Sequence, residues 1–198
     1  MLNAFTYTHE VLLIQHLVSA CPHNSVVAML MDVLMRNCMH RHSASEMERL
    51  SWTHDLIWSV WDRAAVDAKD LFEVAEVYMS CLTMLRTCLM FEPSKEQNIY
   101  GLWPAVGCGR LDCLQIFWNQ VHGKIEARNC DTKVVEEKIQ EMVESGGSGG
   151  GGGDRDQQRL AERMNGMREE ICRLGIMEHM CGMVMELIKE KNRSGGSE

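Results

Sequence analysis

Hydrophobic residues recur at intervals of three and four along almost the whole chain, and polar residues fill the positions between them. This spacing follows one face of an α-helix, which completes a turn every 3.6 residues. No segment shows the two-residue alternation of a half-buried strand bounded by hairpin signals. The sequence therefore predicts an all-α protein, built either as a helical bundle or as a short solenoid of α-α hairpins.

Capping and turn residues divide the first 144 residues into about seven helices joined by short connections, which predicts antiparallel neighbours. The fourth has apolar residues at spacings of three and four along its whole length and is therefore expected to be the central, most buried helix. The predicted helices run from about Thr8 to Ala20, from Asn24 or Ser25, from a capping box at 45–48 to about Ala65, from about Asp70 to Met90, from a capping box at 94–97, from Arg110 to about Glu126, and from Asp131.

Residues 145–153 contain only serine and glycine and divide the chain into unequal parts. No side chain in this run can pack, so nothing offsets the entropy of ordering it, and such tracts are typical of engineered tethers. The tail at 194–198 has a similar composition. The sequence thus predicts an interaction domain at 1–144, an engineered linker at 145–153, a helix taken from a partner protein at 154–193, and a tail left by the engineering at 194–198.

The segment 154–193 carries the most regular pattern in the chain. Steps of four and three from Leu160 give an apolar seam that is interrupted only at Glu178, as expected of one long helix that buries one face. Beyond Leu174, further apolar residues such as Ile176 widen this face, so we expect a hydrophobic groove to enclose the helix. The predicted partner-helix interface comprises Leu160, Met164, Met167, Ile171, Leu174, Met177, Met180, Cys181, Val184, Met185, Leu187 and Ile188.

The groove that receives this helix is expected on the domain at 1–144, which holds all five tryptophans. Most of them belong in a core, while one or two are expected to line the groove. The groove candidates are Trp58, Trp61, Tyr78, Leu85, Trp103 and Trp118. The alternative is a homodimer in which 154–193 pairs with a second copy as a coiled coil, although a seam rich in Met and Cys specifies such a pair poorly. A domain-swapped dimer satisfies both interpretations.

Two segments have the length and layout of a helical repeat. Residues 94–128 span 35 residues with two predicted helices around a glycine turn, and residues 6–39 span 34 with a similar layout. Within the first, Gly109 to Val121 resembles the second helix of pentatricopeptide-type repeats, and more broadly the tetratricopeptide-like helical hairpins. The resemblance implies either single-stranded RNA readout or a protein-binding groove. Two non-adjacent units are too few for sequence-specific RNA reading, so an RNA-binding repeat is the alternative function.

Charge and cysteine content narrow the class of protein further. Residues 1–144 hold 12 Lys or Arg against 19 Asp or Glu, and this acidic balance disfavours general binding to nucleic acid or anionic membranes. The cysteine count of nine is odd, and most cysteines fall within apolar helical patterns, as reduced buried thiols do. No basic leader follows Met1, and no apolar run approaches the roughly 18 residues of a membrane span. These features predict a cytoplasmic or nuclear protein.

No arrangement of residues predicts an enzyme, a cofactor or a metal site. Cys38, His40 and His42 are close in sequence but lack the paired spacing of zinc ligands. His54 and Asp55 are adjacent on a predicted helix, so we expect their side chains to point in different directions. The glycines at 107 and 109 follow no strand and precede no phosphate-binding signature. The sequence therefore favours a scaffold or adaptor module that binds a helix of a second protein, and predicts no catalytic, cofactor-binding or metal-binding residues.

Overall fold

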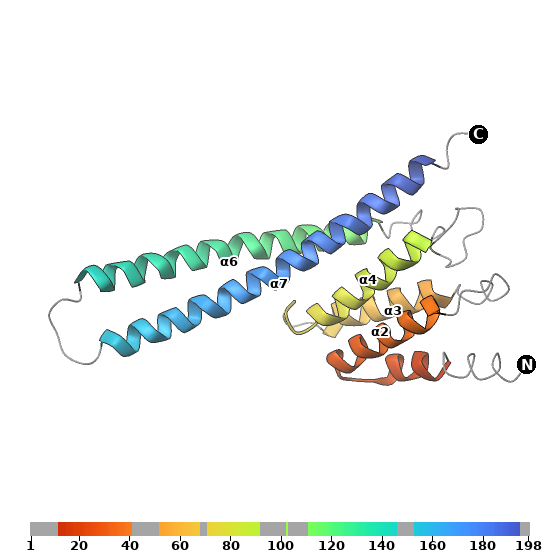
Figure 1. Ribbon diagram of the computed structural model, residues 1–198, viewed down its shortest axis with the longest axis horizontal. Coiled ribbons are helices and arrows are strands. Elements are labelled where there is room, and N and C mark those ends of the chain that lie inside the picture. The colour runs from red at the N-terminus through yellow and green to blue at the C-terminus, as the bar shows by residue number, and fades with distance from the viewer. Residues whose placement is uncertain are drawn as a thin grey trace, which may run out of the picture. The chain divides into compact units, whose positions relative to one another are not determined.

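The computed structural model describes residues 12–40, 52–67, 71–91, 102, 111–145 and 153–194 (Figure 1). Within these ranges the chain forms a helix over residues 12–20 and five longer helices, and it contains no strand. The prediction of an all-α fold is therefore confirmed for the described residues. The predicted sequence of seven helices and one long helix is not matched, because two of the predicted helices are joined into one.

The chain divides into two compact units. Unit 1 comprises Met1–Gln115 and Met180–Glu198, and unit 2 comprises Ile116–His179. Two long helices, α6 (Leu111–Ser145) and α7 (Gly153–Ser194), each contribute residues to both units. The glycine-rich connection between α6 and α7 therefore lies inside the sequence range of unit 2 and does not separate the units.

Helix α4 (Ala75–Phe91) lies between α2 (Asn24–His40) and α3 (Trp52–Asp67) in unit 1 and packs against both. Ten of its 17 residues are buried, in keeping with the expectation of a central, buried helix. The Ser80 hydroxyl donates to the carbonyl oxygen of Ala28 on α2 at 3.3 Å, and the Cys81 thiol donates to that of Ile57 on α3 at 3.8 Å. The polar groups of α4 are thus satisfied inside the core.

The helix over residues 12–20 is held to α3 by an arginine at its end. Nη1 of Arg63 donates to the carbonyl oxygens of Val18 at 2.8 Å and Ser19 at 2.9 Å. The last carbonyl groups of a helix have no partner within the helix, and a cation near them is also favoured by the helix dipole. Arg63 therefore satisfies two otherwise unpaired acceptors where the helix stops.

Helix α4 begins later than the apolar pattern predicts. The pattern places its start at about Asp70, whereas the four residues before Ala75 form turns. The Ala75 amide donates to the Phe72 carbonyl oxygen at 3.4 Å, which is the tighter i to i−3 connection. Leu71 and Val74 are buried nonetheless. Their apolar spacing therefore reflects burial within a turn, and the predicted start was wrong.

The helices predicted on either side of Asp131 form one continuous helix of 35 residues, α6. The Asp131 carboxylate does not begin a new helix but pairs with Arg128 one turn earlier, at 3.6 Å. The Thr132 hydroxyl donates back to the Arg128 carbonyl oxygen at 2.8 Å. Both polar side chains are thus satisfied within a helix interior, and the break predicted from a capping residue was wrong.

Several predicted features lie outside the described residues. These are the capping boxes at 45–48 and 94–97, the groove candidate Trp103, the glycine turn at 107–109, and most of the serine and glycine run at 145–153. Of the helix predicted after residue 94, Leu102 is described, and it is helical and buried.

Candidate partner-helix interface

Helix α6 carries a seven-residue repeat of buried and half-buried side chains. Steps of four and three join every position of the repeat, which is the a/d pattern of a coiled coil. We call these positions the α6 seam: Leu114, Trp118, Val121, Ile125, Arg128, Thr132, Val135, Ile139 and Met142. Leu114, Val121, Thr132 and Val135 are buried, and the others are half-buried. One continuous face of α6 is therefore covered.

Helix α7 carries the matching repeat that the sequence predicts. We call the following residues the α7 seam: Leu160, Met164, Met167, Ile171, Leu174, Glu178, Cys181, Met185 and Ile188. Five of them are buried, namely Met167, Leu174, Cys181, Met185 and Ile188, and the rest are half-buried. Beside the seam, Met177 and Val184 are buried, and Met180 and Leu187 are half-buried. Ile176 is 55% exposed, so the expected widening of the apolar face does not include it.

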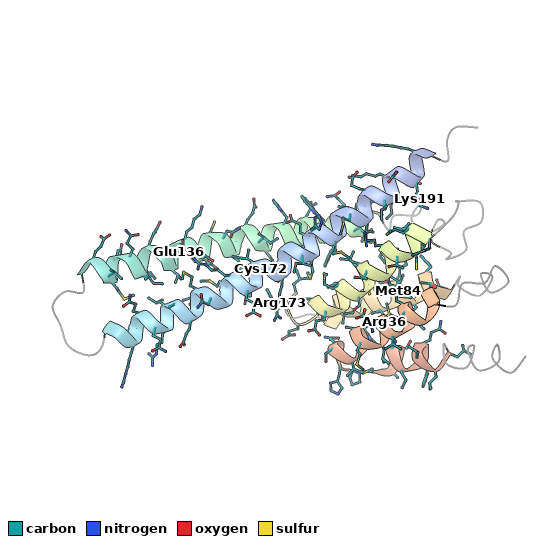
Figure 2. All side chains as sticks on the ribbon, in the orientation of Figure 1. Arg36, Met84, Glu136, Cys172, Arg173 and Lys191 are labelled. Carbon is teal, nitrogen blue, oxygen red and sulfur yellow. The ribbon has the colours of Figure 1, made fainter. Side chains whose placement is uncertain are left out.

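Two ion pairs and one histidine–carboxylate contact join α6 to α7 within unit 2. Arg128 Nε lies 2.6 Å from Glu170 Oε2, and Arg168 Nη2 lies 2.7 Å from Glu136 Oε1. Figure 2 labels Glu136 on α6 and, on α7, Cys172 and Arg173. The third contact brings His122 Nδ1 within 2.6 Å of Glu178 Oε1. From residue 122 to residue 136 along α6, the partners on α7 move back from residue 178 to residue 168. The two helices therefore run antiparallel.

These three contacts fix the register of the two seams. In an antiparallel pair with this register, Val121 lies level with Glu178 and Thr132 lies level with Met167. Every a position of one helix then lies level with a d position of the other along the described part of unit 2. The hairpin therefore has the layout of an antiparallel coiled coil, with buried methionine and leucine side chains in its seam.

His122 connects the polar interruption of the α7 seam to α6. Its ring stacks on Trp118 with centroids 5.1 Å apart and an angle of 6° between the planes. Nδ1 donates to the Glu178 carboxylate, while Nε2 lies 3.5 Å from Glu126 Oε1. Because a half-buried carboxylate needs a donor, His122 accounts for the one charged position of the α7 seam.

The last part of α7 belongs to unit 1, where it contacts the first turn of α6. The Cys181 thiol donates to the Leu114 carbonyl oxygen at 3.5 Å. Burial raises the pKa of Cys181 to about 12, because a thiolate is poorly solvated there. Val184 and Ile188 are also fully buried. This thiol is therefore protonated at neutral pH, and we expect it to be chemically unreactive while α7 is docked.

Four of the groove candidates lie in the core of unit 1. Trp58, Trp61 and Tyr78 form a chain of edge-to-face contacts from α3 to α4, with ring centroids 5.7 Å and 4.7 Å apart. Burial raises the pKa of Tyr78 to about 12. Leu85, on α4, is fully buried. The three aromatic rings thus pack between α3 and α4, and the role of all four residues in holding a partner helix stays a prediction.

The groove prediction omits the α6 seam except for Trp118. Val121 and Val135 are buried there, and Arg128 supplies a cross-helix ion pair. The signal was present in the sequence as an unbroken run of three- and four-residue steps. It was hidden because the break predicted at Asp131 divided this run into two short pieces.

The described residues offer little that resembles catalytic or metal chemistry. In the ranges that the structure describes, no three His, Cys, Asp or Glu side chains gather as the ligands of one metal ion would. Residue His42 lies outside those ranges, and of Cys38 and His40 only the backbone is described. His54 Nδ1 and Asp55 Oδ1 lie 3.0 Å apart near the start of α3, so the expectation that these neighbours point apart was wrong.

None of the helices, over the residues described, combines the length and apolarity needed to cross a bilayer. Comparison of the chain with protein-family models, curated proteins and solved structures found no match. The resemblance of Gly109 to Val121 to pentatricopeptide-type repeats therefore stays a prediction. The contacts between α6 and α7 are what support a functional assignment.

Proposed function

We propose that residues 1–144 form a protein–protein interaction module of the scaffold or adaptor kind, and that residues 154–193 are the helical segment that it binds. The observation that carries this proposal is the pairing of α6 with α7. In unit 2, a covered apolar seam is accompanied by two ion pairs and one histidine–carboxylate contact, each 2.6 to 2.7 Å long. The proposal is for binding of a helix in a groove and not for catalysis.

The seam supplies most of the expected binding energy. Met167, Leu174 and Met177 are at most 5% exposed in unit 2, as are Val121 and Val135 on α6. Each fully buried side chain of this size contributes roughly 1.5 to 3 kcal/mol before the entropy of ordering is subtracted. The ion pairs are half exposed and contribute about 0 to 1 kcal/mol each. Hydrophobic burial therefore provides affinity, and the charges provide alignment.

The same contacts bear on the competing coiled-coil homodimer. A homodimer through the α7 seam would require that a second α7 displace α6 from Leu174 and Met177. A domain-swapped dimer, in contrast, keeps every α6–α7 contact and moves it between two chains. The RNA-binding alternative finds less support, because residues 1–144 hold 19 acidic against 12 basic residues.

A cleavable connection tests the proposal in the folded chain. A specific protease site replaces part of the run at 146–152, and the purified protein is cleaved after folding. We expect the two fragments to elute together in size-exclusion chromatography. Separation of the fragments without denaturant would contradict the proposal. Light scattering on the uncleaved chain distinguishes a monomer from a swapped dimer.

Two matched substitutions in α7 show whether the seam holds the fragments together. Met177 is fully buried and Ile176 is 55% exposed, although the two are adjacent on the same helix. Met177→Glu places a carboxylate in the buried apolar surface beside the α7 seam and should release the cleaved fragment, whereas Ile176→Glu should leave it bound. Release by both variants, or by neither, would refute docking through this face. Retention of RNA that falls steeply with salt would instead favour the RNA-binding alternative.

A further inference from the structure

Two charged residues occupy seam positions that are otherwise apolar or neutral. Arg128 lies in the α6 seam with its side chain 38% exposed, and Glu178 lies in the α7 seam with its side chain 24% exposed. Each of them meets an opposite charge, or a donor, on the other helix. Arg128 Nε is 2.6 Å from Glu170 Oε2, and Glu178 Oε1 is 2.6 Å from His122 Nδ1.

Neither charge finds such a partner when a helix pairs with a copy of itself. In a parallel pair of α7 helices, Glu178 lies level with Glu178 of the second copy, so two carboxylates face each other in the seam. In an antiparallel pair, Glu178 lies level with an apolar d position such as Leu174 or Cys181. The same reasoning applies to Arg128 in a pair of α6 helices. A charge left without a partner in a partly buried seam lowers the stability of that helix pair.

We propose that Arg128 and Glu178 determine partner choice, so that α6 pairs with α7 and neither helix pairs with a copy of itself. This inference rests on the proposed function and adds the residues that make the binding selective. Charged seam residues weaken the intended pair slightly and weaken the unwanted pairs much more, which is how coiled coils reject wrong partners. Replacing either residue by leucine should strengthen the apolar seam and at the same time lose this selectivity.

Photo-crosslinking in the full-length chain measures which helix lies beside α7. Gly175 precedes Glu178 by about one helical turn, and a Cβ atom added at Gly175 meets nothing within 4 Å. A p-benzoylphenylalanine placed at Gly175 therefore reports on neighbours without disturbing the seam. Mass spectrometry of the crosslinked peptides then distinguishes products that join α7 to α6 from products that join α7 to a second α7.

For the chain with both charges intact, we expect crosslinks to α6 near Asn129. For Glu178→Leu, we expect the fraction of products that join two α7 helices to rise about tenfold or more. Glu178→Gln, which removes the charge and keeps the shape, should give a smaller rise. Arg173→Leu is the matched control, because Arg173 pairs with Glu169 on its own helix at 2.7 Å, and it should resemble the unsubstituted chain.

The outcomes separate this inference from the proposed function. If the chain with Glu178 already gives mainly products between two α7 helices, the proposed function itself fails. If that chain crosslinks to α6, and both Glu178→Leu and Glu178→Gln keep its pattern, only the selectivity inference is overturned. An equal rise in Arg173→Leu would also overturn it, because loss of any charge on α7 would then suffice.

Discussion

Leu174→Ala tests whether the α6–α7 seam holds unit 2 together. Leu174 is 1% exposed, so the substitution removes three carbon atoms from a site that water does not reach. At about 0.8 kcal/mol for each buried methylene, the lost transfer energy is about 2.4 kcal/mol, and the cavity adds to it. The facing position, Ile125, is half-buried and can relax toward the space. We therefore expect a loss of about 3 kcal/mol in the free energy of unfolding.

Ile176→Ala is the matched control on the same helix. Its side chain is 55% exposed, so it loses little burial on truncation. Alanine is also the better helix former, by a few tenths of a kcal/mol. We expect Ile176→Ala to change the free energy of unfolding by no more than about 0.5 kcal/mol in either direction. Both variants truncate a four-carbon aliphatic side chain to alanine, so they differ mainly in how far the original side chain is buried.

Urea unfolding followed by far-ultraviolet circular dichroism measures both variants. With a slope of about 2 kcal/mol per molar urea, Leu174→Ala should lower the midpoint by about 1.5 M, while Ile176→Ala leaves it unchanged. A biphasic curve assigns the shift to one of the two units. Equal midpoints for the two variants would refute the reasoning, since they would mean that the seam of α7 is not buried in solution.

Three further predictions concern unit 1. Arg63→Met removes the donor to the Val18 and Ser19 carbonyl oxygens and should cost about 1 to 3 kcal/mol in urea unfolding. Because burial raises the pKa of Cys181 to about 12, iodoacetamide at about pH 8 should modify exposed Cys172 at least about tenfold faster, as peptide mass spectrometry would show; equal rates would contradict docking. The unfolded thiol ionises near its ordinary pKa of 9.0, so the stabilisation that Cys181 gives below that pH should fall as pH rises toward about 12, and Cys181→Ala should flatten this part of an alkaline unfolding curve.

The sequence was sufficient to predict that every described element is helical and that residues 154–193 form one long helix with a single covered face. Apolar spacing determines which face of a helix is buried, and α7 has few competing signals. The spacing does not determine where a helix starts. Leu71 and Val74 continue the α4 pattern although they lie in a turn. Over only four residues, two buried side chains in a turn can have the same spacing as two buried side chains in a helix.

The candidate site was predicted on one side only. The α7 seam follows from its spacing, but its partner surface depends on α6 being continuous. Aspartate is common at the start of a helix, and Asp131 was therefore interpreted as a cap. In the structure it pairs with Arg128 one turn earlier, and the sequence alone does not distinguish these two roles. The aromatic candidates were chosen because tryptophan is frequent in interfaces. Trp58 and Trp61 satisfy the same preference within the core of unit 1.

The stacking of Trp118 on His122 gives the hairpin an optical reporter. Four of the five tryptophans, Trp52, Trp58, Trp61 and Trp103, belong to the sequence range of unit 1, and Trp118 alone belongs to that of unit 2. An imidazole ring in contact with an indole changes its emission, and His122 is held in place by Glu178 of α7. With the other four tryptophans replaced by phenylalanine, the fluorescence of Trp118 would follow the opening and closing of the two helices in real time.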